Sequence, residues 1–472
     1  MILEFIAMLV IFFVLGTAIA FLSRRYLGVG SKEFFVGGYR VGGFISAMTY
    51  AATTYSAFMM VGLAGLTFAT GVASLGFELV YLAATILILS TVGVYMWYGA
   101  RARGWVSPTD MLSDLYGSRA LGIIVAILYL FALVPYTSAQ LKGIGEVFNA
   151  VGISYEIGVL FGAIAIALWT VVAGLWSVAT TDAFQGIWMI VGATAFFVWV
   201  LQFLLPSAGI DWNRFVDLLT RNQNLLSFTW STQMFVGMTL PWIFFALTNP
   251  QVVQRIYIPK DERAYRRMVR YFSIYGLIYT LLCVVLGLAY RAYLEGVGMA
   301  GKFMGNRDAV APYIISLSHP ILASIVYVSI VAAAISTADS IVLSVASAVT
   351  RELYEKVAKN PRESTSKAFS YTSIAIIMVL ATVFAIARIG YVAELSVASS
   401  AYLLPLAPIT LAGIARKGLG RWRPIASLAL GEAIATYATI LYGPAKMLTT
   451  QIAFGAPTPL WILIASTIPL LL

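Results

Sequence analysis

Hydroxyl and carboxylate side chains stand inside a long apolar run in the second half of the chain. Ala333, Ser336, Thr337 and Ser340 recur at a spacing that places them on one face of a helix. A backbone carbonyl followed by hydroxyls three and four residues later offers three oxygens, the ligand type that hard cations prefer. Asp339 adds a carboxylate that a purely structural helix in an apolar setting rarely tolerates. The pattern favours a sodium site, the alternative being serines that bond back to their own helix.

An earlier apolar run contains the small and hydroxylated stretch Ala51–Ala57, followed by Gly62 and Gly65. Such a stretch suits a helix that unwinds locally and exposes backbone carbonyls. An unwound helix beside the first one would supply the remaining oxygens of a cation site. The alternative is a stripe of small residues that allows close helix packing.

Polar and aromatic residues beside expected helix breaks are candidates to contact a solute. Proline removes a backbone donor and kinks a helix, as we expect at Pro135. The candidate solute-binding residues are Thr53, Thr54, Ser56, Glu78, Gln140, Trp242 and Tyr402. Lys142 lies near the expected end of its run, where its long side chain would snorkel to the membrane interface.

Other polar positions have simpler interpretations. Asp182 follows two threonines at an expected helix start, which is the usual setting of an N-cap. His319 is the only histidine and Cys283 the only cysteine, which supports neither a transition-metal site nor a disulfide. The sequence contains no Walker-type or Rossmann glycine motif, so neither ATP-driven transport nor a nucleotide-dependent enzyme is supported.

The composition requires a membrane to surround these residues. Of 472 residues, 61% are hydrophobic and 11% are charged, whereas soluble domains carry roughly 25% charged residues. Apolar runs of roughly 18–25 residues fit spanning helices and not barrel strands. We therefore expect an all-α membrane protein with about 13 transmembrane helices. The expected spans are roughly 2–22, 44–70, 74–98, 119–149, 154–177, 182–206, 231–249, 271–290, 319–347, 368–388, 391–413, 425–443 and 458–472.

Basic residues gather in alternate links between these spans, most densely between Arg255 and Arg270. The positive-inside bias then places the N-terminus outside and the C-terminus inside a plasma membrane. The net charge of +10 is thus a topology signal and not a nucleic-acid footprint. The first run carries Glu4 and lacks a cleavage site, so we interpret it as a retained span and not as a signal peptide.

Several segments resemble the sodium/solute symporter family, the group of the proline, pantothenate, monocarboxylate and sodium/glucose carriers. The matching segments follow one another along the chain: Ser31–Arg40, Pro108–Arg119, Ala173–Gly186, Pro250–Arg255 and Ser336–Ser340. The resemblance implies one transmembrane domain over residues 1–472 with an inverted five-plus-five helix repeat. Spans two to six, about 44–206, and spans seven to eleven, about 231–413, would form the two halves.

The same resemblance implies the ligands of the coupling ion. The main sodium would bind the carbonyls of Ala52, Tyr55 and Ala333 and the hydroxyls of Ser336 and Thr337. Some members of the family bind a second sodium, and the matching positions here are Asp182, Ser336, Asp339 and Ser340. The solute positions match less well. Thr54 stands where proline carriers have an aspartate, Glu78 lies near a glutamate used by sugar carriers, and Trp242 resembles the proline and pantothenate branch.

These observations predict a sodium-coupled secondary active symporter that imports a small, carboxylate-bearing solute by alternating access. Its partners would be that solute and the lipid bilayer, without an organic cofactor or nucleic acid, and its oligomeric state stays open. A sodium/sugar symporter of the same fold and a proton-coupled carrier using Asp182 or Asp339 are alternatives. A membrane solute sensor is a further alternative, and we expect it less because no cytoplasmic domain is evident in the sequence. An intramembrane enzyme would need a catalytic histidine or a nucleophile–base pair, and the sequence offers only the peripheral His319.

Overall fold

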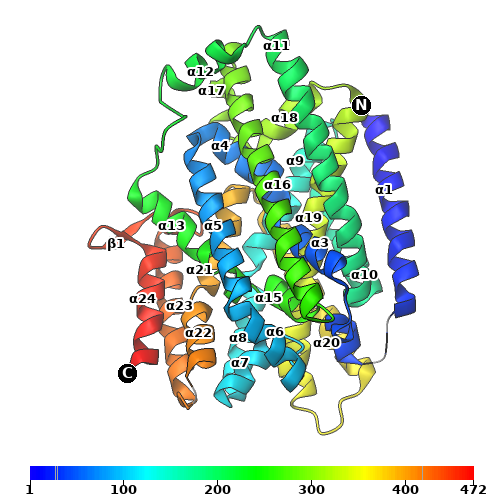
Figure 1. Cartoon of the computed structure of the whole chain (residues 1–472), viewed down its shortest axis with the longest axis vertical. Coiled ribbons are helices and arrows are strands. Elements are labelled where there is room, and N and C mark those ends of the chain that lie inside the picture. Colours follow the sequence, from blue (N-terminus) through cyan, green and yellow to red (C-terminus); the bar gives the residue numbers. More distant parts are fainter. Residues whose placement is uncertain (27, 29, 417) are drawn as a thin grey trace.

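The computed structural model describes residues 1–26, 28, 30–416 and 418–472. Long helices run side by side along one direction, and the two termini lie toward opposite ends of the bundle (Figure 1). Within the described residues, eight helices are long and apolar enough to cross a membrane, or up to ten if two bent pairs each form one span. The all-α membrane class is confirmed, whereas thirteen crossings and a five-plus-five repeat remain predictions.

The helices follow the expected apolar runs, several of them in two pieces. Up to residue 207 they are α1 (Ile2–Ser23), η1 (Arg24–Tyr26), α2 (Ser31–Val36), η2 (Gly37–Tyr39), α3 (Gly43–Thr54), η3 (Phe58–Leu63), α4 (Ala64–Thr70), α5 (Ala73–Ser90), α6 (Val92–Arg103), α7 (Pro108–Tyr116), α8 (Arg119–Ala132), α9 (Val134–Ala150), α10 (Tyr155–Trp199), η4 (Val200–Leu204) and α11 (Leu205–Ser207). After it they are α12 (Trp212–Thr220), α13 (Thr232–Ile243), α14 (Phe245–Thr248), α15 (Pro250–Tyr257), α16 (Glu262–Gly296), α17 (Ala300–Phe303), η5 (Arg307–Ala309), α18 (Val310–Ser316), α19 (Pro320–Val349), η6 (Thr350–Glu355), α20 (Glu363–Ile386), α21 (Val392–Leu403), α22 (Leu406–Ala415), α23 (Trp422–Tyr442), η7 (Lys446–Leu448) and α24 (Thr458–Leu471). A short antiparallel hairpin, β1 (Gln451–Ala453) and β2 (Ala456–Pro457), precedes the last helix.

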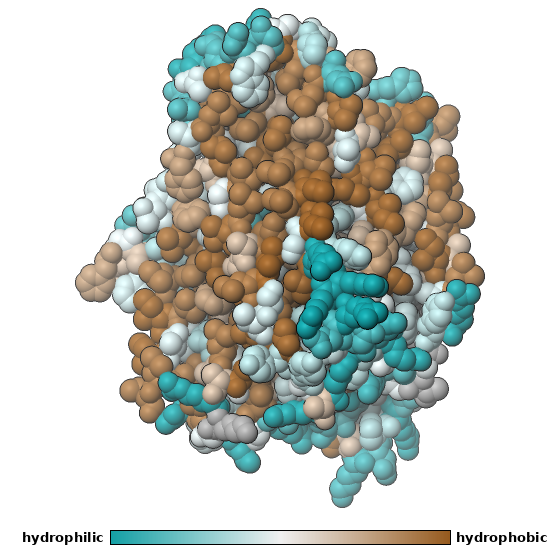
Figure 2. Space-filling view, in the orientation of Figure 1, coloured by the Kyte–Doolittle hydropathy of each residue, from teal (hydrophilic) through white to brown (hydrophobic). Residues whose placement is uncertain are grey.

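The outer surface is apolar across the middle of the molecule. Figure 2 shows a broad hydrophobic zone on this face, with hydrophilic residues at the upper end and over the lower right, where they reach to about mid-height. Large apolar side chains such as Val14 of α1 and Val379 of α20 are exposed in the isolated chain. Lipid is the solvent that such side chains face, and helices satisfy their backbone groups internally there.

Helix α19 forms the centre of the bundle. Every residue from Val326 to Val349 is buried, and the helix packs against α1, α3, α9 and α10. Small residues permit this close approach. At Gly192 of α10, for example, a Cβ atom would lie only 2.0 Å from the Ser329 hydroxyl of α19. The hydroxyl-rich face predicted from the sequence is therefore held in a densely packed setting.

Two spans break where the sequence indicated. The pair Gly43–Thr54 and Phe58–Thr70 bends by 47°, and the pair Val392–Leu403 and Leu406–Ala415 bends by 43°. Tyr55 ends α3 with a non-helical backbone (φ −89°, ψ 87°). The predicted local unwinding of span two is confirmed, as is the break ahead of Pro135, where α8 ends and α9 begins.

Helix α10 also changes direction, at Gly174. This residue has φ 52° and ψ −173°, a backbone conformation that side-chain-bearing residues rarely adopt. A Cβ atom there would also meet the Phe34 ring at 2.9 Å. The break separates the expected spans five and six earlier than predicted, so that Asp182 lies well inside the second helical piece.

A buried ion pair lies toward the end of the bundle where the N-terminus is found. Lys142 Nζ is 2.8 Å from Asp308 Oδ2 and donates to the Gly390 carbonyl at 2.5 Å. The backbone N–H of Val392, where α21 begins, donates to the same carboxylate. Lys142 is only 5% exposed, so the expectation that it snorkels to the interface is wrong. The counter-charge of Asp308 explains why burial of the ammonium group is tolerated.

Toward the other end, Asp110 at the start of α7 joins two separate parts of the chain. Its carboxylate lies 3.2 Å from Arg351 Nε and 2.9 Å from Lys356 Nζ, both in or next to η6. It also completes a capping box with Ser107. Burial alone would raise the pKa of Asp110, but Arg351 and Lys356 outweigh that effect and hold the pKa below its usual value.

A lowered pKa in the folded state means that Asp110 contributes stability above the pKa it has when unfolded, about 4. We expect Asp110→Asn to destabilise the protein by about 2 kcal/mol between pH 5 and 8. The difference should shrink as pH falls below about 4, because the wild-type carboxylate then takes up a proton. Thermal unfolding of both proteins across this range measures it. A difference that grows on acidification would contradict the assignment.

Candidate ion and solute site

The hydroxyls of α19 meet the carbonyl groups at the end of α3. Ser336 Oγ and Thr337 Oγ1 donate to the Ala52 carbonyl at 2.9 and 3.1 Å, and Thr337 Oγ1 also lies 3.2 Å from the Thr53 carbonyl. Ser336 Oγ is 3.1 Å from the carbonyl of Ala333 in its own helix. Four of the five predicted sodium ligands thus converge. A hard cation would find backbone and hydroxyl oxygens from two helices there.

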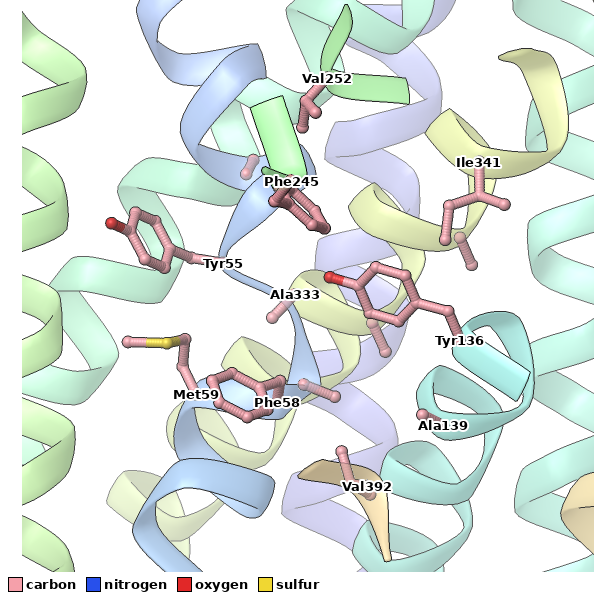
Figure 3. Close-up of a cluster of buried hydrophobic side chains, with 14 of the residues drawn as sticks. Tyr55, Phe58, Met59, Tyr136, Ala139, Phe245, Val252, Ala333, Ile341 and Val392 are labelled. Atoms are coloured by element: carbon pink, nitrogen blue, oxygen red, sulfur yellow. The ribbon is translucent and has the colours of Figure 1, made fainter. Parts of the chain in front are cut away.

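Tyr55, the fifth predicted ligand, lies at the break itself. Its carbonyl follows the last helical turn of α3, so the helix ladder does not continue through it. Figure 3 shows Tyr55 on the uncoiled segment of this span, beside Ala333 of α19. The Tyr55 ring turns toward α16 and stacks on Phe272, with 5.8 Å between ring centroids.

A second polar cluster lies next to these oxygens. Asp182 Oδ2 accepts a hydrogen bond from Thr49 Oγ1 at 2.6 Å, and Thr53 Oγ1 lies 2.9 Å from Ser340 Oγ. Helix α10 runs through Asp182, so the N-cap interpretation of this residue is wrong. Asp182 and Ser340, two of the residues predicted for a second sodium, do face the same cluster.

The positive charge in this cluster is the guanidinium group of Arg255. Arg255 Nη2 donates to Ser340 Oγ at 2.6 Å and lies 3.8 Å from Asp182 Oδ2. The Arg255 side chain is fully buried. The sequence analysis counted Arg255 among the basic residues of an exposed link, and this assignment is wrong. A signal for its role existed: Gln251, Gln254 and Arg255 lie within one turn of each other in an otherwise apolar segment. Structural proximity to Asp182 could not be read from that segment.

Asp339 lies next to a small cavity. Its carboxylate lines a cavity of about 70 Å³ together with Ser177 and Thr181 of α10 and residues of α1. Asp339 Oδ1 and Ser177 Oγ have no hydrogen-bond partner among the described residues. Asp339 thus borders the small cavity and also interacts electrostatically with Asp182 and Arg255, so all three carboxylate and hydroxyl groups predicted for a second cation lie around the arginine.

Backbone donors follow the break in span two. The Ala57 N–H donates to Gln140 Oε1 at 3.1 Å, and the Phe58 N–H donates to Ser56 Oγ at 3.1 Å. Gln140 and Ser56, both predicted to contact the solute, thus cap the N-terminus of the second helical half. A helix N-terminus favours negative charge, and here both N–H groups already donate to side-chain oxygens.

Aromatic rings line the side of the break that faces α5 and α13. Trp242 lies 4.7 Å from Phe58, 5.4 Å from Phe77 and 5.0 Å from Tyr81, measured between ring centroids. Figure 3 shows that Phe245 and Tyr136 also point into this region. Trp242 therefore belongs to the predicted solute region, and Phe77, Tyr81 and Phe245 are additions that the sequence did not single out.

Glu78 follows Phe77 in α5 and precedes Tyr81 by three residues. All three lie on the buried side of the helix. It is fully buried, and neither carboxylate oxygen has a hydrogen-bond partner or an ion pair among the described residues. The hydroxyls of Tyr55, Tyr81 and Thr280 nearby are likewise without partners in that part of the chain. A buried carboxylate is stable only as a neutral acid or beside a positive charge.

Two predicted solute residues, Thr53 and Tyr402, have other partners, whereas Thr54 stays near the break. Thr53 is bonded to Ser340 and belongs to the ion cluster. The Tyr402 hydroxyl is hydrogen-bonded to Thr439 Oγ1 of α23 at 2.5 Å, so the structure does not bring Tyr402 to the break in span two. The Thr54 hydroxyl is buried without a hydrogen-bond partner in the described chain, close to the break.

Buried oxygens around helices that break inside an apolar bundle define a secondary membrane transporter. The chain belongs to the sodium:solute symporter family, whose sequence pattern, SSF, matches residues 34–417. It is therefore a multi-pass membrane transporter and not an enzyme.

Relatives and solved structures agree with this membership. The osmoregulated proline transporter OpuE of Bacillus subtilis (strain 168) is 25% identical over 420 residues, 85% of this chain and 82% of that protein. The sodium/pantothenate symporter of Escherichia coli (strain K12) is 26% identical over 362 residues, 75% and 72% of the two chains. The substrate-bound outward-open state of a Na⁺-coupled sialic acid symporter matches with a TM-score of 0.76 at 16% identity, over 99% of this chain and 97% of that one. Mhp1, a nucleobase-cation-symport-1 family transporter in a closed conformation, matches with a TM-score of 0.54 at 13% identity, over 92% and 93%. At these identities the structural matches establish the fold.

The pairing of Arg255 with Asp182 yields a stability prediction. Arg255→Gln should destabilise the protein by about 3–5 kcal/mol, because it leaves buried carboxylates without their cation. Adding Asp182→Asn should recover at least half of that loss, since the double variant removes both charges. Thermal unfolding of the wild type, both single variants and the double variant measures the coupling. Additive losses in the double variant would show that the two side chains do not interact.

Proposed function

We propose that the protein is a sodium-coupled symporter that imports a small zwitterionic solute, with a carboxylate and a cationic nitrogen, by alternating access across the plasma membrane. The convergence of Ser336, Thr337 and the Ala52 carbonyl at the break in span two is the observation that carries the sodium assignment. Membership of the sodium:solute symporter family supports it. The N-terminus would lie outside and the C-terminus inside, as the basic links predict.

Sodium would act by joining two helices that otherwise meet only through neutral hydrogen bonds. In the proposed site the cation contacts the carbonyls of Ala52, Tyr55 and Ala333 and the hydroxyls of Ser336 and Thr337. A cation bound there fixes the broken span against α19, and the same broken span contacts the solute. Because one rigid element serves both ligands, occupation of one site lowers the cost of ordering the other.

The candidate residues are shielded from both ends of the bundle. Ser336, Thr337, Glu78 and Gln140 are all fully buried. A solute can reach them only after helices move, which is the requirement of alternating access. A membrane potential of 100 mV contributes about 2.3 kcal/mol per charge, and a tenfold sodium gradient about 1.4 kcal/mol. One sodium per cycle could then support roughly 500-fold accumulation of a solute without net charge.

The solute carboxylate would bind where the second half of span two begins. Ser56, Gln140 and the backbone N–H groups of Ala57 and Phe58 meet there, and the helix dipole favours negative charge at that point. Such a position explains a carboxylate-bearing solute better than a sugar, which would need several neutral hydroxyl partners in place of one anion site.

Glu78 would receive the cationic nitrogen of the same solute. Its buried carboxylate has no counter-charge among the described residues. Its neighbours in α5, Phe77 and Tyr81, belong to the ring cluster around Trp242. Aromatic faces and a carboxylate together stabilise a desolvated cation. The proline transporters among the relatives act on a solute of this kind, whereas the pantothenate symporter does not require a cationic nitrogen. A sodium/sugar symporter would be the next candidate if Glu78 accepts hydroxyl groups instead.

The sodium assignment predicts that Ser336→Ala combined with Thr337→Ala abolishes sodium-stimulated uptake. The double change removes two of five proposed ligands while leaving the packing nearly unchanged. Uptake of radiolabelled amino acids into proteoliposomes, with sodium or potassium outside at fixed pH, measures it. Ser329→Ala on the same helix is the matched control, because its hydroxyl contacts only α10 and α19 backbone. Undiminished sodium stimulation in the double variant would refute the site.

The solute assignment predicts that Glu78→Gln weakens binding of solutes with a cationic nitrogen by about 10- to 100-fold, because a charge-assisted contact is lost. Sodium alone should stabilise this variant as it stabilises the wild type. Thermal unfolding with sodium and a panel of amino acids, pantothenate, lactate and glucose measures both effects. Glu432→Gln in α23 is the control, since it removes another poorly partnered carboxyl group. Stabilisation of the wild type by pantothenate or glucose alone would overturn the zwitterion assignment.

A further inference from the structure

Four arginines form one face at the start of α16. Arg263, Arg266, Arg267 and Arg270 are spaced by three or four residues, so they share a side of the helix, and all four are exposed. Together with Glu262 they line an open hollow of about 420 Å³. The volume is within the range of small-ligand sites, about 300–1,000 Å³.

The charge of this arginine face is largely uncompensated. Glu262 pairs with Arg266 one turn away. Arg263, Arg267 and Arg270 form no ion pair with the carboxylates of the described residues. In Figure 2 a dense hydrophilic patch lies where α16 begins and borders directly on the hydrophobic zone. Guanidinium groups match phosphate oxygens in geometry as well as in charge.

The same helix face becomes apolar one turn later. The exposed residues that continue it are Tyr271, Ile274, Leu277, Ile278 and Leu281. Tyr95 and Tyr98 of α6 are also exposed, and α6 adjoins this part of α16 through the ring contact of Trp97 with Tyr265. Exposed tyrosines gather at the membrane–water boundary. The arginine face therefore lies at headgroup depth, with acyl-chain depth directly beyond it.

We propose that the arginine face binds the headgroup of an anionic phospholipid whose acyl chains lie along the apolar continuation of α16. The phosphate and any further acidic group of the headgroup would enter the hollow between the guanidinium groups. A zwitterionic headgroup carries its own cation into the same space and binds less well. The proposal is independent of the solute and sodium assignments, since none of these residues lies in that site.

An excess of basic residues on one end of a membrane protein also has a topological origin. That explanation depends on the number of charges, and it requires neither a common helix face nor a shared hollow. Lys359 and Arg362 provide the comparison. Both are exposed cations in a link at the same end of the bundle, and neither belongs to the arginine face.

The experiment uses the purified full-length protein in detergent, titrated with phosphatidylglycerol, phosphatidylcholine or inorganic phosphate while thermal unfolding is followed. We expect saturable stabilisation by phosphatidylglycerol and little effect of the other two. Arg263→Gln with Arg267→Gln should weaken the apparent affinity for phosphatidylglycerol about 30-fold, at about fivefold per surface arginine. The corresponding lysine variant, which keeps the charges but lacks the guanidinium geometry, should lose less affinity than the glutamine variant.

Lys359→Gln with Arg362→Gln is the matched control and should leave the titration unchanged. Equal stabilisation by phosphatidylcholine would overturn the proposal, as would an unaltered titration in the arginine-to-glutamine variant. Protection by inorganic phosphate at the same concentration would show a phosphate site without a lipid requirement and would also overturn it. An equal loss in the control variant would show that total charge, and not this face, determines lipid binding.

Discussion

The structure depends on one constraint: peptide groups freed at Thr54–Phe58 must find partners where no bulk water reaches. The chain meets it with side chains from other helices. Ser336 and Thr337 reach the carbonyls on one side of the break, and Gln140 reaches the Ala57 N–H on the other. These contacts require α19 and α9 to lie close to the broken span, which explains why α19 carries small residues and is buried along its whole middle. Irregular backbone at membrane depth persists only when protein surrounds it in this way.

Charge compensation imposes the next level of order. Arg255 accompanies Asp182, Lys142 accompanies Asp308, and Asp110 accompanies two cations, each pair joining helices that are distant in sequence. An unpaired charge in such surroundings would cost several kcal/mol. Glu78 departs from this rule among the described residues, and it does so beside the broken span and the aromatic rings. This position is the basis for the proposed contact of Glu78 with the solute.

Local patterns in the sequence predicted what local physics determines. The length of the apolar runs predicted the helices, and the small and hydroxylated stretch at Ala51–Ala57 predicted the break. The helical spacing of hydroxyl residues in α19 predicted its hydroxyl-rich face. Contacts between side chains of helices that are distant in sequence could not be predicted. Arg255 stands at the edge of a basic link, and no single-chain pattern distinguishes a buried arginine from a topological one. The prediction that Lys142 reaches the membrane interface was wrong for the same reason, and so was the placement of Tyr402 beside the break in span two. Their partners, Asp308 and Thr439, are remote in sequence and are brought close only by the fold.

In the proposed mechanism, coupling between sodium and solute follows from the shared break and needs no long pathway. The carbonyl ends of α3 face α19, while the amide ends of the following half face Gln140 and Ser56, only a few residues away. A ligand at either end orders the same uncoiled segment, and each therefore reduces the entropy that the other must overcome. Because the two ends of a broken helix carry opposite partial charges, one break provides a cation site and an anion site together. The proposed symport of sodium with a carboxylate-bearing solute rests on that polarity.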